Sequence, residues 1–185
     1  MLIETERTPN PDTMKFLPGR PVSPAGTRDF ATPEAAEGSP LASALFALGD
    51  VERVFFGADF VTVTRAPGSA DWATLTPLIL ETLVSFFATG QPVVGGDAAA
   101  DAPVHDNPED APIVAQIREL LDTRVRPAVA ADGGDIVYRG FHEGVVFLHM
   151  QGSCAGCPSS TATLKGGIEN LLRHYVPEVV EVRAV

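Results

Sequence analysis

The sequence predicts an α+β protein of two small α/β-sandwich domains joined by a flexible acidic linker. Short runs of β-branched and aromatic residues occur in pairs beside longer runs of helical periodicity, a pattern that favours hairpins packed against helices. Residues 95–110 contain five acidic residues, no Lys or Arg, and many Ala, Gly and Pro, which is typical of a linker. The expected domains, residues 1–94 and 111–185, both have a usual domain size.

Composition disfavours several classes of function. With 13 Lys and Arg against 24 Asp and Glu, the formal charge of -11 opposes the phosphate neutralisation that nucleic-acid binding requires, so we expect no nucleic-acid partner. We find no apolar run approaching the ~18 residues of a membrane span, so we expect no membrane partner. The start of the sequence has neither the pattern of a secretory signal nor that of an Arg-rich transit segment.

The first domain is predicted to open with extended chain. Residues 2–8 read as a strand that ends at the turn cluster 9–12, where each proline restricts its own backbone and that of the residue before it. Residues 14–16 resume the strand. Residues 17–40 then form a loop that is long for a compact domain, with one short strand near residues 28–31.

A helix and a hairpin follow this loop. Ser39 supplies an N-cap and Pro40 the first helical position, and apolar residues continue at helical spacing up to Gly49. Two β-rich runs come next, residues 51–56 and 60–65, and the short turn between them predicts an antiparallel hairpin.

The last element of the first domain is a longer helix. Asp71 caps a short turn, and Thr76 with Pro77 opens the helix proper. The helix ends at Gly90, because a glycine readily adopts the left-handed conformation that closes a helix.

The second domain is predicted to have the order α-β-β-α-β. A helix over residues 113–125, disturbed by Pro127, precedes the glycine turn Asp132-Gly133-Gly134-Asp135, in which the aspartates act as turn-formers and caps. A hairpin joins residues 136–141 to 145–150. A last helix and a strand over residues 179–185 complete the domain.

Cys154 and Cys157 are the only cysteines, and their C-x-x-C lies on the loop between the second hairpin and the last helix. Two cysteines are too few for a disulfide framework, so a ligand or redox pair in a reducing compartment is expected. Pro158 fits the first turn of the helix, which places both sulfurs at the positive end of the helix dipole. This position is expected to lower the pKa of both thiols.

One chain cannot complete a cluster site with good ligands. A zinc or iron-sulfur site takes four soft ligands, and this chain supplies two cysteines. His174 lies ~24 Å along the last helix and His142 ~20 Å or more along the hairpin, while the nearer His149 reads as an ordinary strand residue. His105 is assigned no role. Two copies meeting at a twofold axis would supply four thiolates, the set required by a [4Fe-4S] or [2Fe-2S] cluster.

Three motifs of the second domain carry a resemblance to a known family. Residues from about 112 to 185 resemble the C-terminal domain of NifU-like (Nfu) iron-sulfur scaffold proteins through residues 131–135, 152–160 and 164–169. The first domain is similar to the Nfu N-terminal domain through four segments: residues 8–11, 15–19, 39–42 and 60–63.

The resemblance implies a non-enzymatic scaffold. It would bind a [4Fe-4S] cluster between the two protomers of a homodimer, with Cys154 and Cys157 of each as ligands, and pass it to apo iron-sulfur proteins. The cluster assembly machinery would be the donor, and the N-terminal domain would add no ligands and serve in partner docking. Bacterial and mitochondrial members share this domain order, so the missing transit segment predicts a bacterial cytoplasm rather than a mitochondrial matrix.

Two other uses of the C-x-x-C compete with cluster transfer. A thiol-disulfide oxidoreductase also places such a pair at a helix start, but Pro158 follows the pair here and the motif follows a hairpin rather than a βαβ strand. A zinc-stapled dimer would depend on metal for folding, whereas this chain has enough apolar residues for a core.

Overall fold

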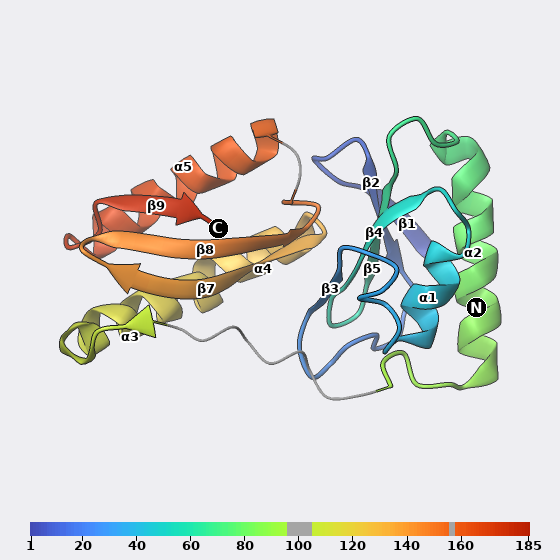
Figure 1. The fold of residues 1–185 in the computed structure, drawn as a ribbon, viewed down its shortest axis with the longest axis horizontal. Helices are drawn as coiled ribbons and strands as arrows, with labels where there is room; N and C mark the ends of the chain where they lie inside the picture. The colour runs from blue at the N-terminus through green and yellow to red at the C-terminus, as the bar shows by residue number, and fades with distance from the viewer. Residues whose placement is uncertain (96–104, 156–157) are drawn as a thin grey trace. The chain divides into compact units, whose positions relative to one another are not determined.

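The chain divides into two compact units, Met1–Ala99 and Ala100–Val185. The computed structural model describes residues 1–95, 105–155 and 158–185. Each unit contains one β-sheet and its own helices (Figure 1), so the predicted α+β class is confirmed.

The sheet of the first unit has five strands in the order β1-β2-β5-β4-β3, and all neighbouring pairs are antiparallel. The strands are β1 (Glu4–Arg7), β2 (Thr13–Leu17), β3 (Arg28–Phe30), β4 (Val51–Phe56) and β5 (Val61–Arg65). The predicted hairpin is β4–β5, in which Val54 pairs with Val63. Because Val54 and Val63 are both completely buried, this register directs one face of the hairpin into the core.

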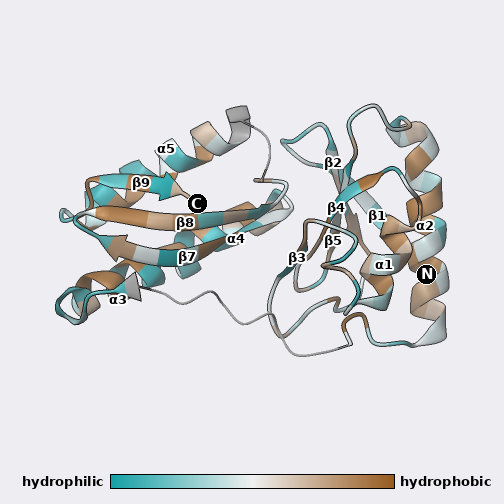
Figure 2. Ribbon diagram, in the orientation of Figure 1, coloured by the Kyte–Doolittle hydropathy of each residue, from teal (hydrophilic) through white to brown (hydrophobic). Residues whose placement is uncertain are grey.

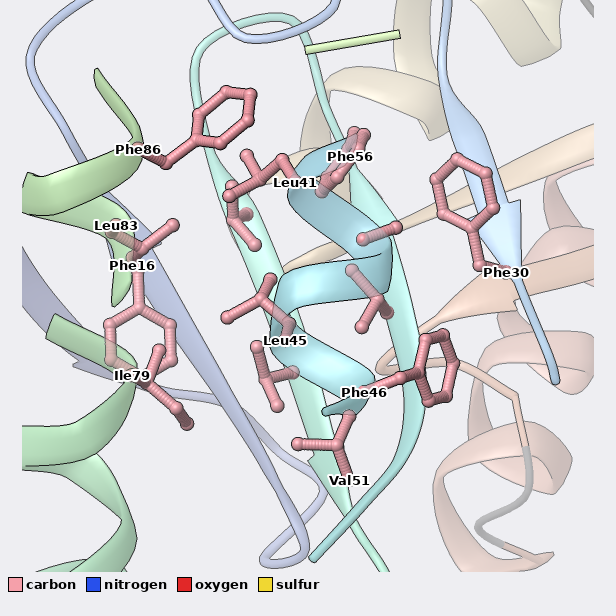
Figure 3. Packing of buried hydrophobic residues seen from close by; sticks show 14 of the residues in the cluster. Phe16, Phe30, Leu41, Leu45, Phe46, Val51, Phe56, Ile79, Leu83 and Phe86 are labelled. Carbon is pink, nitrogen blue, oxygen red and sulfur yellow. The ribbon is translucent and has the colours of Figure 1, made fainter. Parts of the chain in front are cut away.

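Two helices, α1 (Pro40–Phe46) and α2 (Trp72–Thr89), cover one face of this sheet. Ser39 caps α1 as predicted, since its side chain accepts a hydrogen bond from the Ala42 N–H. Figure 3 shows Leu45 of α1 and Ile79 of α2 in one cluster with Phe16 of the sheet, and all three side chains are fully buried. This apolar layer is the core of the first unit.

Helix α2 begins four residues before the predicted position. It starts at Trp72, with the Asp71 carboxylate accepting from the Thr74 N–H at 2.9 Å, and Pro77 lies inside it. Leu75 is fully buried, so the first turn contributes to the core and outweighs the hydrogen bond that a proline removes. The end at Gly90 is as predicted, with a left-handed φ of 68°.

Length and composition alone would allow α2 to cross a membrane, contrary to the expectation that no segment approaches that length. Core helices of soluble proteins can have the same length and apolar composition. Five apolar side chains of α2 are buried in the first unit: Leu75, Ile79, Leu83, Phe86 and Phe87.

The long loop before α1 is tied to the domain by buried side chains. Val22 and Ala36 belong to the core cluster, and the Val22 N–H donates to the Ala58 carbonyl in the β4–β5 turn at 2.8 Å. The segments of the loop on either side of the short strand β3 are therefore packed against the domain. This packing explains how a small domain can contain so long a loop.

The sheet of the second unit has the order β6-β7-β8-β9. Its strands are β6 (His105–Asp106), β7 (Gly134–His142), β8 (Val145–Gly152) and β9 (Glu181–Ala184). The predicted hairpin is β7–β8, and its turn uses a positive φ at Glu143 and at Gly144. Strands β6 and β9 pair in parallel with β7 and β8, respectively.

The helical layer of this unit begins with η1 (Pro108–Asp110) and α3 (Ala111–Leu120), continues through the π-helical turn η2 (Leu121–Val125), and ends with α4 (Arg126–Ala131). Helical chain thus extends past the predicted end at Val125. Pro127 is near the start of α4, where its missing N–H is tolerated. Helix α5 (Pro158–Tyr175) contributes Ile168 and Leu172 to the hydrophobic core of this unit, together with Ile117 of α3 and Leu148 of β8. Figure 2 shows the hydrophobic first half of β8.

Part of the predicted linker is built into the second unit. Residues 105–106 form β6, and the Asp106 carboxylate accepts from the Tyr138 hydroxyl at 2.6 Å and from the Phe141 N–H at 3.0 Å. Burial, followed by the bond to Asp106, raises the pKa of Tyr138. One acidic residue that was read as a solvated tether is therefore a structural acceptor.

A side chain occupies one backbone donor on the outer edge of β9. The Val182 N–H donates to the carboxylate of Glu169 on α5 at 3.1 Å, and Glu169 also lies 3.9 Å from Arg173, one turn along the helix.

Candidate functional site

Cys154 lies in the loop between β8 and α5, as predicted. Its thiol is free and buried, with 6% of the residue exposed, and it belongs to the core cluster of the second unit. Cys157, the other predicted ligand, is outside the described residues. The structure therefore defines one half of the predicted pair.

Backbone and hydroxyl contacts hold Cys154 in place from both sides. Gly152 leaves β8 with a φ of 65°, which agrees with the sharp exit expected there. Ser153 then donates through its N–H to the Gly133 carbonyl at 3.2 Å and through its hydroxyl to the Asp132 carbonyl. From α5, the Thr161 hydroxyl donates to the Cys154 carbonyl at 2.9 Å.

The glycine turn between α4 and β7 packs directly against this loop. Gly133 has a φ of 84°, so the expected positive φ is present. Gly134 starts β7 and lies directly beneath Cys154: a Cβ on Gly134 would be 2.7 Å from the Cys154 Sγ and 2.7 Å from the Gln151 carbonyl oxygen. The sulfur occupies the space that a side chain would take.

Asp135 has a different role from the predicted turn-former. It is 3% exposed, and its two carboxylate oxygens accept from Arg126 Nε and Nη2, each at 2.9 Å. These hydrogen bonds are the leading cause of the raised pKa of the Arg126 guanidinium. Arg126 also contacts Asp122, one turn earlier, at 3.2 Å. This ion pair fastens the helical layer to β7 beside Gly134.

The pKa of the Cys154 thiol is raised from 9.0 to about 11, opposite to the predicted direction. Burial is the main cause and the nearby charges of Asp132 and Asp135 add to it, while the hydrogen bond to Ser153 acts the other way. Desolvation outweighs the field of the helix start. A thiol-disulfide oxidoreductase needs an accessible thiolate, so this environment disfavours that alternative.

Cys154 has the donor chemistry of an iron-sulfur or zinc ligand, since the sulfur is soft and seated in a cradle of fixed shape. Within residues 1–95, 105–155 and 158–185, no group of three or more His, Cys, Asp and Glu could hold a metal ion. His149, the nearest histidine on the strand, has its Nδ1 2.8 Å from the Val185 carbonyl oxygen.

The sequence pattern indicated Cys154 but not its surroundings: Ser153 and Gly134 lie beside it, and the Arg126–Asp135 pair is next to Gly134. One signal was available for Gly134. Only one glycine of the pair is needed for the turn, and a glycine at a strand start often marks the close approach of another group.

Comparisons with known proteins agree with the resemblance seen in the motifs. Residues 3–90 match the family model described as scaffold protein Nfu/NifU N terminal, and residues 117–183 match the NifU-like domain. The human protein named NFU1 iron-sulfur cluster scaffold homolog, mitochondrial, is 50% identical over 100% of this chain and 72% of its own length. NifU-like protein 4, mitochondrial, of Arabidopsis thaliana is 50% identical over 97% of this chain and 64% of its own length.

The chain thus spans between three fifths and three quarters of the length of these relatives. A solution structure of a NifU-like protein from Saccharomyces cerevisiae is 24% identical, with a TM-score of 0.47 over 52% of this chain and 86% of that one.

The prediction of a bacterial cytoplasmic location is wrong. The human, plant and insect relatives are named as mitochondrial proteins. The prediction depended on the missing transit segment, and the start of this sequence says nothing about targeting when its relatives are longer.

Proposed function

The chain belongs to the NifU-like (Nfu) family of iron-sulfur cluster scaffold proteins, and from this premise we propose that it binds a [4Fe-4S] cluster between two protomers. Cys154 and Cys157 of each protomer are the ligands. The protein acts as a carrier rather than an enzyme: it receives the cluster from the assembly machinery and passes it to apo iron-sulfur proteins. A [2Fe-2S] cluster would satisfy the same number of ligands.

The observation that carries this proposal is the fixed position of the Cys154 side chain. Its sulfur rests over Gly134, and its loop is held by Ser153 and Thr161, so one soft ligand has a fixed position. The chain contains two cysteines and a cluster needs four, which a second copy can supply.

The residues of the site perform three tasks. Cys154 supplies sulfur to the cargo, and because ligation requires the thiolate, binding releases its proton. Gly134 leaves room for the sulfur, and the Arg126–Asp135 pair holds β7 beside it. A bound cluster at a seam between subunits is exposed when the seam opens, which suits transfer to another protein.

We also propose the domain division 1–94, 95–110 and 111–185, in which β6 and η1 of the middle segment are part of the second unit, and the first domain serves in partner docking. The separate family matches over residues 3–90 and 117–183 support this division.

Anaerobic reconstitution with iron and sulfide tests the proposal. The full chain should take up four irons and four sulfides per two chains and change from monomer to dimer, and Mössbauer spectra should identify the cluster. Cys154→Ser and Cys157→Ser should each abolish uptake, whereas the control His149→Gln should load normally. A wild-type chain that remains monomeric and takes up no iron would refute the proposal, as would tight zinc or catalysed reduction of a model disulfide.

A further inference from the structure

We infer that Gly134 is a positioning residue for the cluster ligand: its missing side chain is the space in which the Cys154 sulfur sits. The inference rests on the proposed function in one respect only, namely that the Cys154 sulfur binds a cluster. The contact itself is a property of the chain alone.

The requirement at Gly134 is one of space and not of backbone conformation. Gly133, the preceding residue, has a positive φ of 84°, whereas the φ of Gly134 is in the range that all residues adopt. The two glycines of the turn therefore have separate tasks. Gly133 allows the chain to turn from α4 into β7, and Gly134 allows Cys154 to descend onto the start of β7.

The distances determine how far the sulfur would have to move. A Cβ on Gly134 would lie 2.7 Å from the Cys154 Sγ, and ordinary van der Waals contact begins at 3.4 Å. The sulfur would therefore retreat by ~0.7 Å or more, while a functional group must be held within ~0.5 Å of its productive position. The second obstacle, the Gln151 carbonyl oxygen at 2.7 Å, belongs to the backbone of β8, which is paired with β7.

The direction of the displacement follows from the packing. Cys154 is part of the buried cluster that includes Met150 and Ile168, and a close-packed core has no room to receive the sulfur. Gly134→Ala would push the sulfur outward, away from β7. Cys154 would then be more exposed and out of place as a ligand.

Alkylation of the apo chain tests the displacement without any cluster. In a Cys157→Ser background Cys154 is the only thiol, and Gly134→Ala should raise its alkylation rate roughly tenfold or more, because reactivity follows exposure. Gly166→Ala is the matched control, since a Cβ on Gly166 of α5 meets nothing within 4 Å. An unchanged rate in folded Gly134→Ala would overturn the inference.

Thermal melts of a double-mutant cycle cover the case in which Gly134→Ala folds poorly. The substitution should lower the Tm by roughly 4–24 °C, as overpacking does, and by clearly less in a Cys154→Ala background, where the sulfur is gone. Equal shifts in the two backgrounds would show that Gly134 accommodates something other than the sulfur.

Cluster loading completes the experiment. With Cys157 present, Gly134→Ala should lose the visible absorption of the reconstituted cluster, while Gly166→Ala retains it. Normal loading of Gly134→Ala with unaltered spectra would overturn the positioning role. If the wild-type chain takes up no cluster, the proposed function fails, but the alkylation rates and the melts still decide the inference.

Discussion

Arg126 forms ion pairs with Asp135 and Asp122. Arg126→Met, which breaks both pairs, should destabilise the second unit far more than Asp122→Asn, which breaks only the second. The two acidic partners differ in environment: the Asp135 side chain is 5% exposed and accepts two hydrogen bonds from Arg126, whereas that of Asp122 is 61% exposed and accepts one from Arg126. Arg126→Met removes two charge-assisted donors from a carboxylate that solvent barely reaches. Asp122→Asn removes one contact that water can replace.

The expected magnitudes follow from this difference. Breaking a fully buried pair by removing one partner costs ~3–5 kcal/mol. The Arg126 side chain is 42% exposed, so water can partly replace it, and we expect about 2–3 kcal/mol for Arg126→Met. This corresponds to a fall in Tm of roughly 8–24 °C for a domain of this size. Arg126→Lys keeps the charge but loses the planar guanidinium that donates both hydrogen bonds. Its loss of stability should therefore be smaller than that of Arg126→Met but still measurable.

Hydrogen exchange of the amides in β7 and β8 should be measured on the full chain at increasing urea, because it reports the second unit selectively. The fluorescence of Trp72, the single tryptophan, reports the first unit and should have an unchanged midpoint in every variant. Asp122→Asn should alter the free energy of unfolding by no more than ~0.5 kcal/mol. If Arg126→Met and Asp122→Asn lower the free energy of unfolding by the same amount, the buried Arg126–Asp135 pair does not fasten the helical layer to β7.

Three further outcomes are expected. Asp71→Ala should cost about 1 kcal/mol in urea unfolding followed by Trp72 fluorescence, because the cap of α2 is lost. Gly144→Ala should cost more than ~1 kcal/mol in amide exchange, because φ is 81° and the new Cβ would lie 2.8 Å from Val180 Cγ2. The apo chain should lose stability as pH rises from 9 towards 11, since the unfolded chain releases the Cys154 proton first; melts of Cys154→Ala should lack this part of the pH dependence.

Local signals were enough to predict much of the fold. The N-cap at Ser39, the left-handed glycine at Gly90 and the hairpin turn before Val145 each depend on a few adjacent residues. Such features are determined by the backbone preferences of the residue types involved.

What could not be predicted depends on partners distant in sequence. Asp106 was read as linker because its acceptor role depends on Tyr138, more than thirty residues later. Asp135 was read as a turn-former because its pairing with Arg126 depends on how α4 lies against β7. For Cys154, the sequence indicates the helix start that would lower its pKa but not the side chains whose packing raises it.

The occupied backbone donor on the edge of β9 affects how copies of the chain can associate. Unpaired backbone groups at a sheet edge are where proteins add strand upon strand and aggregate. At Val182 the N–H is already taken by Glu169, which also places a negative charge at the edge. An incoming strand would have to displace that carboxylate before it could pair. Glu169 therefore opposes strand addition at this edge of the sheet, and leaves the proposed association of two copies to other surfaces, such as the cysteine loop.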